Sequence, residues 1–237
     1  MEDLHAAALE CLLASDPDEK CRLTHALYLA SRDQLMVAGD AAAAVIINVP
    51  GRPERSLLVP PRELKRRGLG SAEGQGGLIH ALSHIEFNAI NLALDAVYRF
   101  RDLPGDYYRD WIRVADEEAY HFQLMRDHLN TLGYDYGDFD AHNGLWEMAQ
   151  KTAHDPLVRM ALVPRVREAR GLDVTPGIMK KLSDHGDAAA VAILEIIFRD
   201  EVGHVEIGTR WFHYLCDKRN LEPDATFRGL FEEYMGV

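Results

Sequence analysis

The chain has 237 residues, a hydrophobic content of 47% and a formal net charge of −12. This length allows one large domain or two small ones, and the apolar content is sufficient for a substantial core. The acidic balance argues against general nucleic-acid binding, although it leaves room for a local basic patch.

Three cysteines, Cys11, Cys21 and Cys216, show neither a Cys-x-x-Cys spacing nor an even disulfide framework. We therefore interpret them as reduced thiols. The first three residues are acidic in balance and lack the positive start and apolar core of a signal peptide. No apolar run is long enough to cross a membrane. These features predict a cytoplasmic protein that does not contact a membrane.

The N-terminal part of the chain is predicted to be a helical extension over residues 1–45, followed by a long loop over residues 46–75. Two short helices are expected in the extension, at 2–14 and 17–31, because Asp16-Pro17 is a typical helix start. The loop contains four prolines and is basic, so it is either a solvated connection or a lid or anion site. Its basic residues are Arg52, Arg55, Arg62, Lys65, Arg66 and Arg67.

Four long apolar-striped segments are then predicted to form an all-α, four-helix bundle over residues 76–218, with a C-terminal helix in 219–237. The whole chain is expected to form a single domain. The bundle helices are expected at about 75–102, 106–132, 155–169 and 187–217, with shorter helices at 142–153, 177–183 and 224–235.

The third bundle helix carries two residues that disfavour a regular helix. Pro164 removes one backbone hydrogen bond and is expected to bend the helix near Glu168, which either aims that side chain or is a simple packing kink. Gly171 is expected to end the helix.

Two Glu-x-x-His pairs lie on these segments, Glu118/His121 and Glu201/His204. Positions i and i+3 share one face of a helix, so each pair can reach one metal ion together. A single glutamate precedes each pair at a matched spacing, Glu86 before the first and Glu168 before the second. The order Glu, then Glu-x-x-His, twice over, is the ligand set of a carboxylate-bridged dinuclear site in a four-helix bundle.

The neighbours of these residues support a metal site over ordinary surface pairs. Glu86 interrupts an apolar stripe that includes Ile79 and Ile90, and a buried carboxylate has to be neutralised, paired or bound to a metal. A third pair, Glu2/His5, is interpreted as an ordinary exposed pair, because one such motif alone is more often structural. Four carboxylates and two imidazoles suit two iron ions, or two manganese ions or a mixed pair.

Residues that flank the predicted ligands are candidates for holding the histidines. Asp200 and Glu117 each precede a ligand glutamate and can accept the second ring N–H of a metal-bound histidine. For Glu117, an exposed pair with Arg113 is the alternative. Two residues before Glu86, His84 points away from the site and joins a polar stripe that is expected to face solvent or form a homodimer interface. That stripe consists of His84, Asn88, Asn91 and Asp95.

With these residues in view, the chain resembles a bacterial family within the ferritin-like superfamily of di-iron carboxylate proteins. Four stretches carry the resemblance: HALSHIEFNAINLALD at 80–95, DEEAYHF at 116–122, LVPRVREARGLDVTP at 162–176 and DEVGHV at 200–205. The resemblance extends over nearly the whole chain and implies a ferritin-like bundle with a di-iron site at the six positions. A distant relative in the superfamily hydroxylates a modified adenosine in tRNA.

The leading hypothesis is an oxidase or hydroxylase that activates O₂ at two iron ions and acts on a small-molecule substrate. A metal-binding or ferroxidase-type iron-handling protein without an organic substrate is the first alternative. An RNA-modifying hydroxylase that uses the basic loop to approach phosphates is the second, and the acidic total charge makes it the weaker one.

Overall fold

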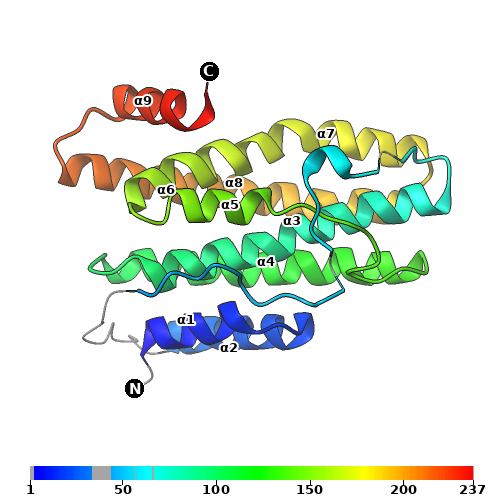
Figure 1. The fold of residues 1–237 in the computed structure, drawn as a ribbon, viewed down its shortest axis with the longest axis horizontal. Coiled ribbons are helices and arrows are strands. Elements are labelled where there is room, and N and C mark those ends of the chain that lie inside the picture. The colour runs from blue at the N-terminus through cyan, green and yellow to red at the C-terminus, as the bar shows by residue number, and fades with distance from the viewer. Residues whose placement is uncertain (1–2, 34–43, 56, 66, 237) are drawn as a thin grey trace.

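The structure is a computed structural model that describes residues 3–33, 44–55, 57–65 and 67–236. Most of these residues are helical, and they form no β-strand beyond an isolated bridge between Leu58 and Ala141. Figure 1 labels the helices in chain order. They are α1 (Leu4–Leu13), α2 (Pro17–Asp33), η1 (Pro61–Glu63), α3 (Ala72–Arg99), α4 (Gly105–Thr131), α5 (Gly144–Lys151), α6 (Pro156–Leu162), η2 (Val163–Glu168), α7 (Ala169–Asp184), α8 (Ala188–Lys218) and α9 (Pro223–Met235).

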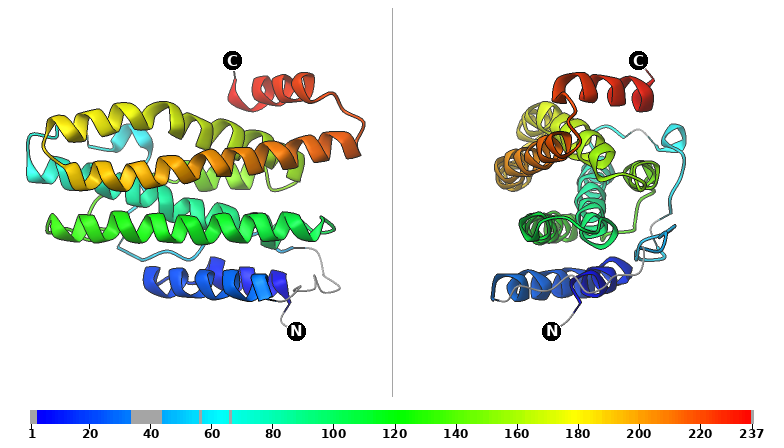
Figure 2. Two further views of the ribbon diagram at one scale, coloured as in Figure 1. Left: turned by 180° about the vertical axis from the view of Figure 1, so that it is seen from behind. Right: turned by 90° about the vertical axis from the view of Figure 1, so that its left-hand side faces the viewer.

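The helices form a bundle whose long members are α3, α4, α8 and the continuous run α6–η2–α7. Seen end-on, these four lie around a shared interior, with α1 and α2 outside α3 and α4 and with α9 on the opposite side (Figure 2). The short connection between α3 and α4 places the two side by side as neighbours. The predicted all-helical bundle is therefore confirmed.

Local sequence signals explain where the bundle helices begin. Ser71 accepts a hydrogen bond from the Gly74 backbone N–H at 3.1 Å, and Asp187 accepts one from Ala190 at 3.0 Å. Such N-cap side chains satisfy a donor that has no partner within the helix. Because Ser71 caps α3, the helix starts at Ala72 and the preceding loop is slightly shorter than predicted.

The third bundle helix differs from its prediction. Gly171 does not end it, and the separate helix expected at 177–183 does not exist, because α7 continues from Ala169 to Asp184. Packing of α6, η2 and α7 along α8 outweighs the low helix propensity of the glycine. The irregularity lies earlier, where the six residues of η2 form a π-helix that begins just before Pro164. Because proline has no N–H to donate, the backbone ladder is rearranged at this point.

The polar stripe on α3 is buried within the chain, so its expected exposure to solvent or to a second copy is wrong. His84, Asn88, Asn91 and Asp95 are all less than 9% exposed. His84 Nδ1 lies 2.9 Å from the Tyr136 hydroxyl, and Asp95 forms an ion pair with the buried Arg159 at 2.8 Å. The chain's own α5 packs on α3, and the four polar side chains of the stripe are buried within the described part of the chain. A homodimer remains a prediction without this support.

Two further expectations near the N-terminus can be compared with the structure. His5 is 2% exposed and its Nδ1 donates to the Val97 carbonyl at 2.8 Å, so it does not belong to an exposed pair. A histidine that donates to a buried carbonyl is a core residue. Glu2 and positions 34–43 lie outside the described residues. The described helices contain no segment long and apolar enough to cross a membrane.

The proline-rich loop packs along the bundle (Figure 1) and uses part of its basic charge internally. Arg55 forms an ion pair with Asp138, and Arg67 forms one with Glu73 at 2.9 Å. Backbone hydrogen bonds on both sides of Leu58 join the loop to Ala141. Arg66 lies outside the described residues. Part of the positive charge of the loop is therefore balanced within the chain.

Candidate metal centre

The predicted ligands lie in a polar layer that divides the apolar interior in two. On α4, Phe122 and Ala119 belong to the larger apolar cluster, whereas Met125 and Leu129 belong to the smaller one. On α8, Ile197 belongs to the smaller cluster. Glu118 and His121 lie between Ala115 of the larger cluster and Met125 of the smaller one. Glu201 and His204 lie between Ile197 of the smaller cluster and Ile207 of the larger one. Apolar packing on both sides of the layer limits access of water to the carboxylates.

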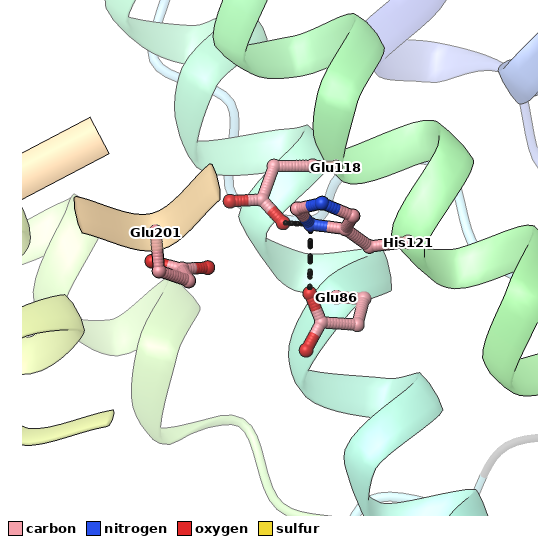
Figure 3. A group of neighbouring side chains, drawn as sticks. All are labelled: Glu86, Glu118, His121 and Glu201. Atoms are coloured by element: carbon pink, nitrogen blue, oxygen red, sulfur yellow. Dashed lines mark hydrogen bonds and ion pairs between the residues drawn. The ribbon is translucent and has the colours of Figure 1, made fainter. Parts of the chain in front are cut away.

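Four of the six predicted residues approach closely enough to hold one metal ion. Glu86 from α3, Glu118 and His121 from α4, and Glu201 from α8 each offer a ligand atom, and these atoms lie within 4.8 Å of one another. Figure 3 shows Glu86 and Glu118 both approaching the Nδ1 atom of His121, with Glu201 near them on α8. All four side chains turn into the bundle, as their spacing on apolar stripes predicts.

Glu118 lies between the two histidines. Its Oε2 is 3.4 Å from His121 Nδ1, and its Oε1 is 3.0 Å from His204 Nδ1. His204 Nδ1 is also 3.7 Å from Glu201, so the fifth predicted residue adjoins the group of four. Glu118 therefore directs one carboxylate oxygen toward each imidazole.

The sixth predicted residue, Glu168, comes from the last position of η2. Its Oε2 is buried without a hydrogen-bond partner. Burial raises the pKa of Glu168 well above its usual value, and the charge of Glu201 raises it further. Glu168 therefore belongs to the same electrostatic cluster, although it is not one of the four residues whose ligand atoms group within 4.8 Å.

Each histidine is held from behind by a carboxylate of the opposite helix. His121 on α4 places Nε2 at 3.2 Å from Asp200 of α8, and His204 on α8 places Nε2 at 2.8 Å from Glu117 of α4. Both candidates named from the sequence thus occupy the expected place. The alternative role expected for Glu117, an ion pair with Arg113, is also present at a distance of 3.6 Å. A carboxylate at Nε2 fixes the ring orientation and directs Nδ1 into the cluster.

The carboxylates and histidines perturb one another strongly. Burial raises the pKa of Glu86 to about 8, despite the opposing effect of His121. Burial alone would raise the pKa of Glu118, but the adjacent His204 and His121 bring it below the usual value. Burial lowers the pKa of His121, but Glu118 and Glu86 outweigh it and raise the pKa to about 11. Such opposed shifts in one buried cluster are typical of a functional site.

Comparison with known proteins places the chain in a family. A model of the family described as "Protein of unknown function (DUF455)" matches residues 13–237. The chain belongs to the DUF455 family. An uncharacterized protein of Haemophilus influenzae (strain ATCC 51907 / DSM 11121 / KW20 / Rd) is 50% identical over 233 residues, which cover 94% of this chain and 81% of that protein. No solved structure matches the chain significantly.

In this DUF455 chain, the cluster has the unmet bonding capacity that a metal site requires. Carboxylate oxygens of three residues are buried without a hydrogen-bond partner, and native proteins leave few such atoms. They are Glu86 Oε2, Glu168 Oε2 and Glu201 Oε2. When ionised, the four carboxylates would carry a charge of −4, which two divalent cations beside neutral imidazoles would balance. The four grouped residues therefore fit one metal ion, and the charge of the whole layer would suit two.

The sequence did not reveal one residue on which the layer depends. Gly208 lies on α8, and a Cβ built there would overlap the ring of Pro164. Glycine at this position allows η2, and with it Glu168, to approach α8 closely. A signal was available, because a glycine within a long helical pattern that also faces the core often marks a close approach of another backbone.

Proposed function

We propose that the chain is a dinuclear metal carboxylate protein with a ferritin-like arrangement of helices. Glu86, Glu118, His121, Glu168, Glu201 and His204 would hold the two ions, which we infer to be iron. The observation that carries the proposal is the position of Glu118 between the Nδ1 atoms of two histidines, beside buried and unpartnered carboxylate oxygens. Mixed carboxylate and imidazole ligands suit iron or manganese.

The chain's own residues prepare both histidines for this role. Because Asp200 and Glu117 each lie at hydrogen-bond distance from one Nε2, they hold a proton on that atom and keep the Nδ1 lone pair directed toward the cluster. Glu118, His121 and His204 are fully buried, so their positions are fixed by packing. The carboxylates of the layer can change their contacts without moving the helices that carry them.

We infer that the reaction is the oxidation of a small organic molecule by O₂. When bound, ferrous ions would supply electrons and open positions for O₂, chemistry that side chains alone do not provide. The apolar clusters on both sides of the layer support this inference, because they exclude water from a reactive centre. An iron-handling role without an organic substrate is the outcome to be distinguished by experiment.

The first test measures metal content after anaerobic loading with ferrous ion. We expect about two ions per chain in the wild-type protein and a loss of both in Glu118→Gln, because this carboxylate faces both histidines. The matched control is Glu195→Gln, which changes an exposed glutamate on α8 and is expected to retain both ions. A wild-type protein that takes up no metal, or a Glu118→Gln protein that keeps both ions, contradicts the proposal.

The second test measures O₂ consumption by the ferrous protein, with and without candidate organic substrates. An oxidase or hydroxylase is expected to consume O₂ faster when an oxidisable substrate is present and to release an organic product. O₂ consumption that ends after the bound iron is oxidised, whatever organic compound is added, supports iron handling instead.

A further inference from the structure

A surface pocket away from the predicted ligands gathers a different kind of side chain. It has a volume of about 520 Å³ and is formed where α2, α4 and α8 meet. Its charged lining consists of Arg32, Arg109, Arg113, Arg210, Asp106 and Asp110. Four guanidinium groups in one pocket are unexpected in a chain with a net charge of −12.

The two carboxylates of this pocket are already engaged. Asp106 forms an ion pair with Arg109 one turn away on α4. Asp110 forms one with Arg210 of α8 and also accepts a hydrogen bond from Trp211 Nε1 at 2.8 Å. Four arginines against two aspartates leave two positive charges in excess, because 4 − 2 = 2. Asp110 thus fixes one wall of the pocket and does not neutralise it.

The excess charge is available to a ligand. Arg32 lies over the Tyr28 ring at 5.8 Å and forms no ion pair with a described side chain. Arg113 is exposed and lies 3.6 Å from the partly buried Glu117, which is beyond the distance of a direct hydrogen bond. Since Glu117 in turn contacts His204, the pocket adjoins the metal centre without sharing a predicted ligand.

We propose that this pocket binds the phosphate group of a small phosphorylated molecule. Guanidinium groups present planar pairs of N–H donors that match phosphate oxygens, and they carry this function better than lysine. A phosphate monoester carries nearly two negative charges at neutral pH, which the two excess arginines balance. The pocket volume exceeds that of a phosphate ion, so the site has room for the organic part of the molecule.

The test is calorimetric titration of the full-length, metal-free chain with inorganic phosphate and, separately, with glycerol 3-phosphate. We expect both compounds to bind. Tighter binding of the ester would identify a phosphorylated metabolite as the ligand, whereas equal affinities of the ester and inorganic phosphate would identify free phosphate. Arg32→Gln and Arg113→Gln are each expected to weaken binding at least about tenfold, because each removes a charge-assisted contact. The control is Arg22→Gln, an exposed α2 arginine paired with Glu19, which is expected to bind as the wild type does.

Two results would overturn the phosphate assignment. One is the absence of binding by the wild-type chain, or binding that the two pocket variants leave unchanged. The other is equal binding of malonate, which would make the pocket a general anion site. Because the titration uses metal-free protein, its result does not depend on whether the six predicted ligands hold metal.

Discussion

The two helical pairs of the bundle carry the same pattern of glutamates and histidines but present it differently. In the first pair, α3 and α4 are uninterrupted helices, and Glu86, Glu118 and His121 approach one another directly. In the second pair, α8 is equally regular, but its partner contains a π-helical segment that ends at Glu168. The same sequence pattern is therefore built once by regular helix geometry and once by a local rearrangement of the backbone.

The difference shows what each pair contributes to the layer. Regular helices place i and i+3 side chains on one face without further help. A π-helical turn is rare and shifts the residues that follow it around the helix axis, and it often occurs at functional sites. Glu168 is thus positioned by Pro164 and by the close approach of Gly208, so the second pair depends on contacts that the first pair does not need.

The substitution expected to have the largest effect on the second helix pair, without a counterpart in the first, is Gly208→Ala. The added methyl group would overlap the Pro164 ring, which is rigid, so α8 and η2 have to move apart. We expect a loss of roughly 3 kcal/mol in the free energy of unfolding, as for other overpacked cores, and weaker metal binding. Urea unfolding and metal content after ferrous loading measure the two effects.

The same helix offers a matched control in Gly203→Ala. Nothing lies within 4 Å of a Cβ at Gly203, so this change is expected to leave stability equal or raise it by up to about 1 kcal/mol. Combining Gly208→Ala with Pro164→Gly should restore part of the metal binding, since the ring is then absent. Equal effects of the two alanine variants would show that η2 does not depend on this contact.

A smaller effect is expected at the first pair on acidification. His80 of α3 is buried and its Nε2 accepts from the Gly137 backbone N–H, so it has to be neutral. Burial, together with His84 and Arg67, lowers its pKa to about 4, although Asp138 and Asp135 oppose this shift. The unfolded chain binds this proton near pH 6.5, the folded chain only near pH 4.

Stability from His80 is therefore fully present above pH 6.5 and is lost as the pH falls toward 4, by roughly 2 to 3 kcal/mol. Denaturant unfolding of the wild type and of His80→Gln across this range measures it, and the variant should show the shallower dependence on pH. His185→Gln, at an exposed position, serves as the control. Identical pH profiles for wild type and His80→Gln would contradict the prediction.

The smallest expected effects test whether the carboxylates that contact the Nε2 atoms of His121 and His204 contribute equally to metal binding. Glu117→Gln removes the carboxylate behind His204, and Asp200→Asn removes the one behind His121. We expect each to weaken metal binding by about 10- to 100-fold, with Asp127→Asn on the exposed side of α4 unchanged. Competition with a chelator measures the affinities, and a large effect from only one of the two variants would refute equivalence.

Much of this architecture follows from sequence alone because it rests on local rules. Apolar stripes, cap residues such as Ser71 and Asp187, and the i and i+3 spacing at Glu118 and Glu201 predict the bundle helices and the inward direction of these side chains. The ligand role of the six residues remains a prediction. The positions of Asp200 and Glu117 behind the histidines also followed from their place beside the glutamates.

The features that could not be predicted depend on tertiary contacts. Burial of His84 and Asp95 requires α5 and Arg159, which are distant in sequence, so a polar stripe on one helix resembled a surface. The continuation of α7 past Gly171 requires the support of α8. The π-helical segment results from a proline that a glycine on another helix accommodates, and no local pattern records that pairing.

The reciprocal contacts of Asp200 with His121 and of Glu117 with His204 have a consequence for a single helical hairpin. The residue before the predicted ligand glutamate of one pair contacts the histidine of the other pair, so neither hairpin holds its own histidine alone. Two identical hairpins related by a two-fold axis would produce this reciprocal arrangement without further adjustment. A single hairpin of this kind would lack the carboxylate that holds its own histidine, so it would need a second copy to supply that contact.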